Sequence, residues 1–121
     1  MGLGPVSIVE VEARKPGKPA EAEALRAQMG QSYVIACDEH GKALASRAFA
    51  ARIAQLRDDG IRDLTLVIGG ADGLDPALLS EARETLAFGV QTWPHALVRV
   101  MLAEQVYRAV TILSGSPYHR D

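Results

Sequence analysis

The chain has 121 residues, of which 48% are hydrophobic and 23% are charged, and its formal net charge is −2 at pH 7. This length and composition predict a single globular domain over residues 1–121, since domains typically contain about 100–150 residues. The slightly acidic balance excludes a general nucleic-acid coat protein, which would be strongly basic, so any contact with nucleic acid must be local.

The N-terminal part of the chain predicts a strand, a loop and a short helix. Residues 6–11 (VSIVEV) alternate loosely and are bracketed by glycine and proline, which is typical of a strand. Residues 13–19 (ARKPGKP) have the composition of a loop, which favours a plain linker over a binding arm. Residues 19–29 are rich in helix formers, and Gly30 is placed to end this helix.

The next segment predicts a second strand that ends in a turn. Residues 32–37 (SYVIAC) are an apolar run of strand length, and residues 38–41 (DEHG) have turn composition. Cys37 is the single cysteine, which excludes an internal disulfide. Together with the absence of a secretory leader and of a membrane-length apolar run, it predicts a cytoplasmic protein with no membrane partner.

Residues 46–68 predict a helix and a third strand. Ser46 is placed to cap the helix, and Phe49, Ile53 and Leu56 fall on one face at helical spacing. The charged residues of the helix predict a solvated outer face rather than an RNA-binding stripe; they are Arg47, Arg52, Arg57 and Asp58. Gly60 ends the helix. Residues 64–68 (LTLVI) are continuously apolar, as in parallel strands that are covered on both faces.

A glycine-rich loop, residues 69–76 (GGADGLDP), follows the third strand and leads into a helix that Asp75 can cap and Pro76 can begin. Strands alternating with helices predict an α/β fold with a parallel sheet. Ligands of open α/β sheets bind beyond the carboxyl ends of the strands, so the position of this loop suggests a ligand site. Its glycine spacing matches no nucleotide-binding motif, and the loop alone leaves a structural turn and a ligand loop equally open.

The C-terminal part is dominated by an apolar helix. Residues 84–88 predict a last short strand, and Pro94, at the first helical position, starts a helix near His95. Residues 97–113 leave this helix almost no polar face, so it must be covered on all sides. We expect one side to face the sheet and the other a second subunit, which predicts a homodimer.

Polar groups of this half suggest chemistry without specifying a reaction. His95 is expected to be neutral, and a hydrogen-bonding role and a buried, satisfied histidine are equally open. Glu104 and Arg108 have ion-pair spacing, whereas Arg99 has no such partner in sequence and suggests a group that binds phosphate or carboxylate. The histidines and Cys37 lack metal-ligand spacing, so no metal site is expected.

Three segments of the chain resemble one family: residues 64–76 (LTLVIGGADGLDP), 92–109 (TWPHALVRVMLAEQVYRA) and 116–120 (SPYHR). They are similar to the RlmH family of SPOUT-class methyltransferases, which act on a pseudouridine of 23S ribosomal RNA. The resemblance covers nearly the whole chain. It implies a C-terminal deep trefoil knot, S-adenosylmethionine (AdoMet) as cofactor, a homodimer, and methylation of N3 of a pseudouridine in helix 69 of the ribosome's 23S rRNA.

Carried over by position, the resemblance also implies a cofactor pocket and catalytic residues. The pocket residues are Cys37, Gly69, Phe88, Gly89, Val90, Gln91, Thr92 and Trp93. Backbone groups of such loops can read the adenine edge while apolar side chains enclose its faces. Tyr118 and His119 are expected to orient the base or handle its proton, and Arg108 to hold phosphate or the methionine carboxylate. The tail is expected to reach across the dimer.

Relatives of this family begin with a further strand and helix, so the chain looks shortened at its N-terminus. We therefore expect folding and AdoMet binding to survive better than RNA methylation. Two alternatives stay open. One is a knotted dimer that binds AdoMet without methylating RNA; the other is a Rossmann-type nucleotide binder, which the missing phosphate fingerprint disfavours.

Overall fold

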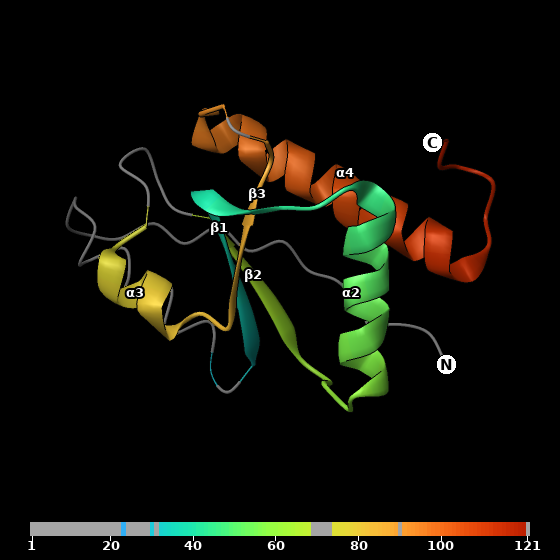
Figure 1. Cartoon of the computed structure of the whole chain (residues 1–121), viewed down its shortest axis with the longest axis horizontal. Helices are drawn as coiled ribbons and strands as arrows, with labels where there is room; N and C mark the ends of the chain where they lie inside the picture. The colour runs from blue at the N-terminus through green and yellow to red at the C-terminus, as the bar shows by residue number, and fades with distance from the viewer. Residues whose placement is uncertain (1–22, 24–29, 31, 69–73, 90, 121) are drawn as a thin grey trace.

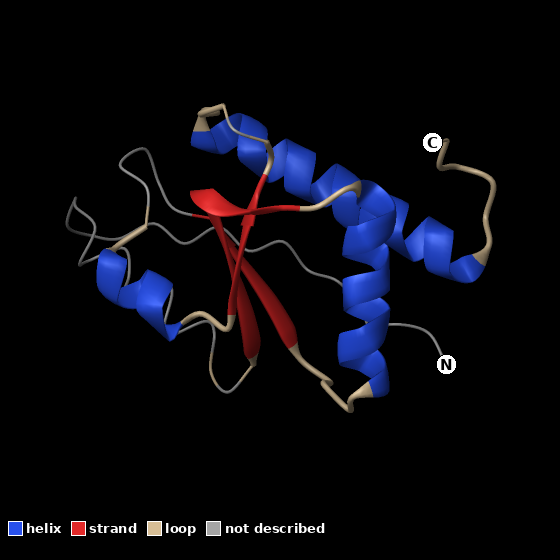
Figure 2. Cartoon of the chain, viewed as in Figure 1, coloured by secondary structure: helices blue, strands red, loops and turns tan. Residues whose placement is uncertain are grey.

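The computed structural model describes residues 23, 30, 32–68, 74–89 and 91–120. Strands and helices alternate along these ranges, as the sequence predicts (Figures 1 and 2). The elements are β1 (Tyr33–Ala43), α2 (Ser46–Asp58), β2 (Leu64–Ile68), α3 (Pro76–Glu81), β3 (Glu84–Ala87) and α4 (His95–Ser114). The strand predicted at residues 6–11, and the helix predicted at 19–29 except for Glu23, lie outside the described residues.

The strands form a parallel sheet in the order β2-β1-β3. The register of β1 on β2 runs from Tyr33 opposite Leu64 to Cys37 opposite Ile68. The parallel arrangement predicted from the continuous apolar run of β2 is therefore confirmed. Because the strands are parallel, the carboxyl ends of β2 and β3 meet at one edge of the sheet.

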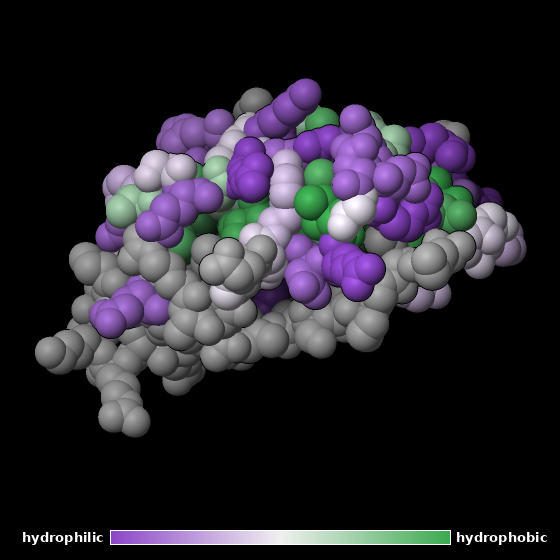
Figure 3. Space-filling model, turned by 90° about the horizontal axis from the view of Figure 1, so that it is seen from below, coloured by the Kyte–Doolittle hydropathy of each residue, from purple (hydrophilic) through white to green (hydrophobic). Residues whose placement is uncertain are grey.

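Helices cover both faces of the sheet. Ile35 and Cys37 of β1 belong to a core that α2 and α4 complete, whereas Val34 and Ala36 belong to a second core with Leu78 of α3. Successive residues of β1 thus face opposite layers, as the pleat of a strand requires. The buried face of α2 is as predicted; its members are Phe49, Ile53 and Leu56, together with Ala50. On the face seen in Figure 3, hydrophilic side chains separate the hydrophobic ones into small patches.

The turn predicted at residues 38–41 is wrong, because β1 continues through these residues to Ala43. They form a bulge instead: both Cys37 and Lys42 lie opposite Leu86 of β3, and the residues between them have no counterpart in the ladder. Gly41 makes this bulge possible. A Cβ at Gly41 would lie 2.8 Å from the backbone nitrogen of Leu86, so only glycine fits without a shift of one strand.

The predicted cap of α2 is also wrong. Ala45 occupies the N-cap and makes no side-chain cap hydrogen bond, and Ser46 is the first residue of the helix. The hydroxyl of Ser46 instead donates a hydrogen bond to Oε1 of Gln105 on α4, at 2.7 Å. The residue that was expected to stabilise one helix end therefore links two helices.

The starts of α3 and α4 agree better with the sequence. The carboxylate of Asp75 accepts a hydrogen bond from the backbone N–H of Ala77 at 2.8 Å, and Pro76 is the first residue of α3. Helix α4 begins at His95 as predicted, with Pro94 at the N-cap rather than in the first helical position. Among the described residues, no helix is both long and apolar enough to span a membrane.

Arg52 does not belong to a solvated face, contrary to the prediction. Its guanidinium donates to both carboxylate oxygens of Glu84, with Nη2 2.6 Å from Oε2, and Nη2 also lies 3.1 Å from the hydroxyl of Tyr33. The Tyr33 hydroxyl donates to the same carboxylate. Because Tyr33 and Glu84 are the first residues of β1 and β3, this cluster ties α2 to the amino edge of the sheet. Arg47 and Asp58 are exposed, as predicted.

The Glu84 cluster predicts a component of acid sensitivity. The hydrogen bond from Arg52 lowers the pKa of the Glu84 carboxyl below its usual value, more than burial raises it. A carboxyl whose folded-state pKa is lowered contributes stability that is present above its unfolded pKa of about 4.3 and is lost as the pH falls through the folded value. Urea unfolding followed from pH 7 to pH 3 should therefore show a loss of stability that Glu84→Gln reduces. Asp59→Asn, at the exposed end of α2, is the control and should keep the wild-type pH profile.

Candidate functional site

The carboxyl edge of the sheet carries the residues that the sequence assigns to a cofactor. β2 ends at Ile68, directly before the glycine loop, and β3 ends at Ala87, directly before Phe88. Cys37 lies opposite both Ile68 and Leu86, so it stands where these two segments leave the sheet. Gly69 and Val90, also predicted here, lie outside the described residues.

Cys37 is a packing residue in this position. Its side chain is buried, and burial raises the pKa of the thiol to about 12. A thiol of this kind stays protonated at neutral pH and is a poor nucleophile. At this edge Cys37 therefore acts as a small apolar member of the core.

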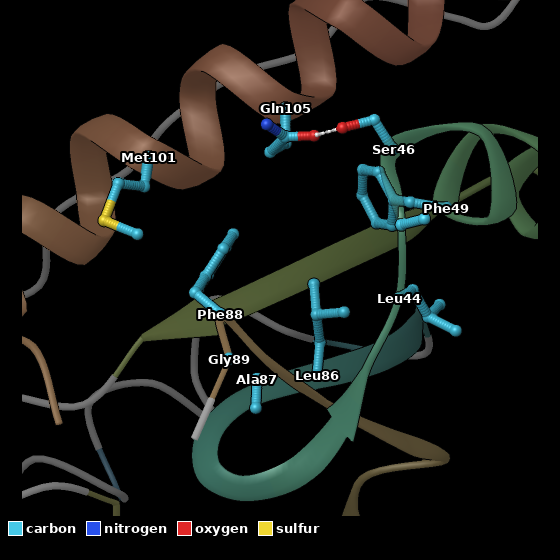
Figure 4. Close-up of a pocket in the computed structure, with 10 residues that line it drawn as sticks. Leu44, Ser46, Phe49, Leu86, Ala87, Phe88, Gly89, Met101 and Gln105 are labelled. Atoms are coloured by element: carbon cyan, nitrogen blue, oxygen red, sulfur yellow. Dashed lines mark hydrogen bonds between the residues drawn. The ribbon is translucent and has the colours of Figure 1, made fainter. Parts of the chain in front are cut away.

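A cavity of about 280 Å³ opens beside this edge, between α4 and the ends of β1 and β3 (Figure 4). Its lining residues are Leu44, Ala45, Ser46, Phe49, Leu86, Ala87, Phe88, Gly89, Met101 and Gln105. The lining is largely apolar, and the hydrogen bond from Ser46 to Gln105 provides a polar feature in the wall. Of the predicted cofactor residues, Phe88 and Gly89 reach this cavity. Met101 and Gln105 were not identified as site residues from the sequence. Helical periodicity places them only in α4, and their position in the cavity wall depends on how α4 packs on the sheet.

The predicted cofactor loop is held by two side-chain hydrogen bonds. The indole Nε1 of Trp93 donates to the carbonyl oxygen of Phe88 at 2.8 Å, which closes the loop on itself. The hydroxyl of Thr92 donates to the carboxylate of Glu39 in the β1 bulge. Gly89 has a φ of 89°, in the left-handed region that favours glycine. Gln91, Thr92 and Trp93 are exposed, so the outer half of the loop faces away from the protein interior.

The three predicted catalytic residues come together at the C-terminal end of α4. Arg108 binds Glu104 through two hydrogen bonds, with Nη2 2.9 Å from Oε2, which confirms the predicted ion pair. Nη1 of Arg108 lies 3.0 Å from Nδ1 of His119. The hydroxyl of Tyr118 donates to Glu104 at 2.9 Å, and the guanidinium of Arg108 lies 4.9 Å from the centre of the Tyr118 ring. We refer to Glu104, Arg108, Tyr118 and His119 as the tail cluster.

The contacts of the tail cluster define which groups donate and which accept hydrogen bonds. A guanidinium can only donate, so Nδ1 of His119 must accept from Arg108 and the ring proton must sit on Nε2. The hydrogen bond from Arg108 lowers the pKa of Glu104, and the hydrogen bond to Glu104 raises the pKa of Tyr118. Tyr118 therefore remains a protonated donor at neutral pH. The cluster presents donors rather than a ready base.

The cofactor loop and the tail cluster lie at opposite ends of α4 (Figure 1). Pro94 and Arg108 are fourteen residues apart, which is about 21 Å along a helix that rises about 1.5 Å per residue. Within one chain, the structure brings Arg108, Tyr118 and His119 together but does not bring them to the described residues of the predicted cofactor loop. The two groups of residues are therefore not joined into one site within a single chain.

The structure does not support a role in the site for two other polar residues that the sequence suggested, Arg99 and His95. Arg99 is exposed on α4 and makes an interaction within the chain. The suggestion that it binds phosphate or carboxylate depended on its lacking a partner, so that suggestion loses its support. The side chain of His95 lies outside what the structure describes. No group of three potential metal-ligating side chains occurs among the described residues.

Known proteins resemble the chain over nearly its whole length. A family model described as "Predicted SPOUT methyltransferase" matches residues 4–119. Proteins named "Ribosomal RNA large subunit methyltransferase H" from Caulobacter vibrioides and Caulobacter sp. are 71% and 73% identical to the chain over 121 residues. These alignments cover 100% of the chain and 78% and 79% of the two relatives. A protein of the same name from Ruegeria pomeroyi is 57% identical over 99% of the chain and 78% of its own length. The chain therefore belongs to the RlmH family of SPOUT methyltransferases.

Proposed function

We propose that the chain is an AdoMet-dependent methyltransferase of the large ribosomal subunit, which methylates N3 of a pseudouridine in helix 69 of 23S rRNA. The observation that carries the proposal is 71% identity, over the full chain, to a relative named as a large-subunit rRNA methyltransferase. It follows that the protein acts in the cytoplasm, where ribosomes are found. The name of this relative indicates large-subunit ribosomal RNA as the substrate. The modified nucleotide and its methylated atom are proposed from the family resemblance.

The residues at the carboxyl edge of the sheet fit the cofactor. A cavity of about 280 Å³ is close to the lower end of the range of small-molecule sites, about 300–1,000 Å³. Its apolar walls suit an adenine ring, and the side chains of Phe88 and Met101 face this space (Figure 4). When AdoMet is bound, its sulfonium supplies an activated methyl group. The loop after β3 would then hold the cofactor through its backbone N–H and C=O groups.

The surface of α4 supports a homodimer. Large hydrophobic side chains that are exposed among the described residues all fall between residues 93 and 118; they are Trp93, Leu97, Val100, Tyr107, Val110 and Tyr118. Leu97, Val100 and Tyr107 recur at spacings of three and seven, which places them on one stripe of the helix. An exposed apolar stripe of this kind is typical of a protein interface.

We propose that the α4 stripes of two subunits pack antiparallel. This pairing places the tail cluster of one subunit near the cofactor loop of the other and removes the separation of about 21 Å within one chain. It agrees with the expectation that the tail reaches across the dimer. The proposal includes the deep trefoil knot of the family, whose implied loops contain residues 69–73 and 88–93.

The tail cluster suits the positioning of an RNA base. The protein must align N3 with the methyl group, and the imide proton of N3 passes to solvent water because the tail cluster presents donors rather than a base. In the tautomer that accepts a hydrogen bond from Arg108 at Nδ1, Nε2 of His119 carries the ring proton and can donate it to a carbonyl oxygen beside N3. The hydroxyl of Tyr118 and the guanidinium of Arg108 are already oriented by Glu104. These three residues would therefore orient the base, and Arg108 would have further N–H groups for a phosphate.

The test is a radiolabel-transfer assay with methyl-labelled AdoMet and ribosomes from a strain that lacks this methyltransferase. We expect label in 23S rRNA at the helix 69 pseudouridine. Naked helix 69 RNA should bind weakly, because a chain of net charge −2 offers few phosphate contacts and relies on the assembled ribosome. A chain that binds AdoMet in calorimetry but transfers no label would instead support the alternative of a non-catalytic AdoMet-binding dimer.

A further inference from the structure

The bulge of β1 reaches the predicted cofactor loop through Glu39. One carboxylate oxygen of Glu39, Oε2, accepts the hydrogen bond from the hydroxyl of Thr92. The other, Oε1, lies 3.5 Å from Nε2 of His40. The side chain of Glu39 is 45% exposed, so these two contacts, rather than burial, orient its carboxylate.

The backbone that carries Glu39 is fixed to the sheet on both sides. Cys37 and Lys42 both lie opposite Leu86 of β3, so the bulge begins and ends at paired residues. The close approach of Gly41 to the backbone of Leu86 leaves no space for a Cβ. The bulge itself is shaped by a hydrogen bond from the backbone N–H of His40 to Oδ2 of Asp38, at 3.0 Å. Glu39 therefore extends from a rigid support.

Thr92 belongs to a loop whose other end lines the cavity. Trp93, the next residue, donates its indole N–H to the carbonyl oxygen of Phe88. Phe88 and Gly89 in turn line the cavity beside the carboxyl edge of the sheet. A shift of Thr92 would thus be passed through Trp93 to the cavity wall.

We propose that Glu39 is a positioning residue, which holds the described loop residues 88–89 and 91–93 against the β1 bulge through Thr92 and thereby sets the affinity of the site for AdoMet. The assignment of the cofactor rests on the proposed function, whereas the holding of the loop does not. The hydroxyl of Thr92 needs an acceptor oxygen at this position. A glutamine at this position keeps an acceptor for Thr92, whereas alanine does not.

The first test needs no cofactor, because Trp93 is the single tryptophan of the chain and reports the state of the loop. We expect Glu39→Ala and Thr92→Val to shift the emission of Trp93 to the red and to increase its quenching by acrylamide. Glu39→Gln should resemble the wild-type protein, as should the control Asp63→Asn, an exposed carboxylate just before β2. Unchanged quenching in Glu39→Ala would overturn the proposal.

The second test is calorimetric titration with AdoMet. Glu39→Ala and Thr92→Val should each weaken binding about threefold to tenfold, as expected for one lost hydrogen bond, and the double variant should bind no more weakly than either single one. In Glu39→Ala, whose side chain is not among the proposed pocket residues, the rate of methyl transfer at saturating AdoMet should not change. Independent, additive effects would contradict a shared role. Absence of AdoMet binding in the wild-type chain, with the Trp93 response intact, would overturn the cofactor assignment but support the holding of the loop.

Discussion

Replacing Val100 by glutamate is expected to split the dimer and to lower methyl transfer by at least about 100-fold, the scale of loss expected when catalytic groups are misplaced. The side chain of Val100 is 60% exposed and lies on the α4 stripe with Leu97 and Tyr107. A twofold interface would bury the new carboxylate in both subunits without a partner, which strongly disfavours association. Light scattering after size-exclusion chromatography measures the oligomeric state, and label transfer to ribosomes measures the activity.

Ala51→Glu provides the matched control, because Ala51 is an exposed residue of α2 and also gains a carboxylate. This variant should remain dimeric and active. Circular dichroism of the Val100→Glu variant should show wild-type helix content, since substitutions at exposed positions rarely disturb a fold. A variant that stays dimeric and fully active would contradict the proposed interface. A monomer with full activity would contradict the arrangement in which the tail of one subunit serves the site of the other.

The parts of the fold that could be predicted from the sequence depend on local patterns. The apolar spacing of Phe49, Ile53 and Leu56 predicts the buried face of α2, and the continuous run of β2 predicts a parallel strand. The cap at Asp75 was also predictable, because an N-cap contacts a backbone group only two residues away. Each of these signals lies within a few consecutive residues, so it does not depend on where the rest of the chain lies.

The errors in the sequence-based predictions arise where distant residues meet. The composition of residues 38–41 predicts a turn, but pairing with β3 on both sides keeps these residues in a strand. Arg52 looks solvated in its own helix, yet Glu84, thirty-two residues away, binds it. Ser46 looks like a cap, and Gln105 of α4 accepts its hydrogen bond instead. Tertiary contacts outweigh local preference at all three positions.

The candidate site was predictable mainly through the family resemblance. Ion-pair spacing alone predicted the contact between Glu104 and Arg108, which lie four residues apart on α4. The addition of Tyr118 and His119 depends on how the chain folds back after Gly115, where the backbone has a φ of 79°. No periodic pattern in the sequence predicts that the chain folds back onto α4 at this point. The roles of the cluster and of the cofactor loop remain predictions.

Replacing Arg108 by alanine is expected to lower the rate of methyl transfer about 100-fold. AdoMet affinity should stay unchanged, as the proposed role in orienting the base requires; a loss of affinity would indicate instead that Arg108 holds the methionine carboxylate. Arg108 contacts every other member of the tail cluster: it binds Glu104, donates to Nδ1 of His119 and lies against the ring of Tyr118. Without it, the His119 ring loses the contact that fixes its tautomer, and Glu104 loses the cation that lowers its pKa. Single-turnover label transfer measures the rate, and calorimetry measures the affinity.

Two further variants separate positioning from charge. Arg108→Lys keeps the positive charge but loses the planar fork that binds Glu104 and His119 together, so it should recover little of the lost rate. Arg57→Ala removes an arginine that pairs with Asp58 on α2, away from the tail, and should transfer methyl groups at the wild-type rate. Full activity in Arg108→Lys would show that charge alone matters. Full activity in Arg108→Ala would remove the tail cluster from the reaction, because Arg108 contacts each of the other three members.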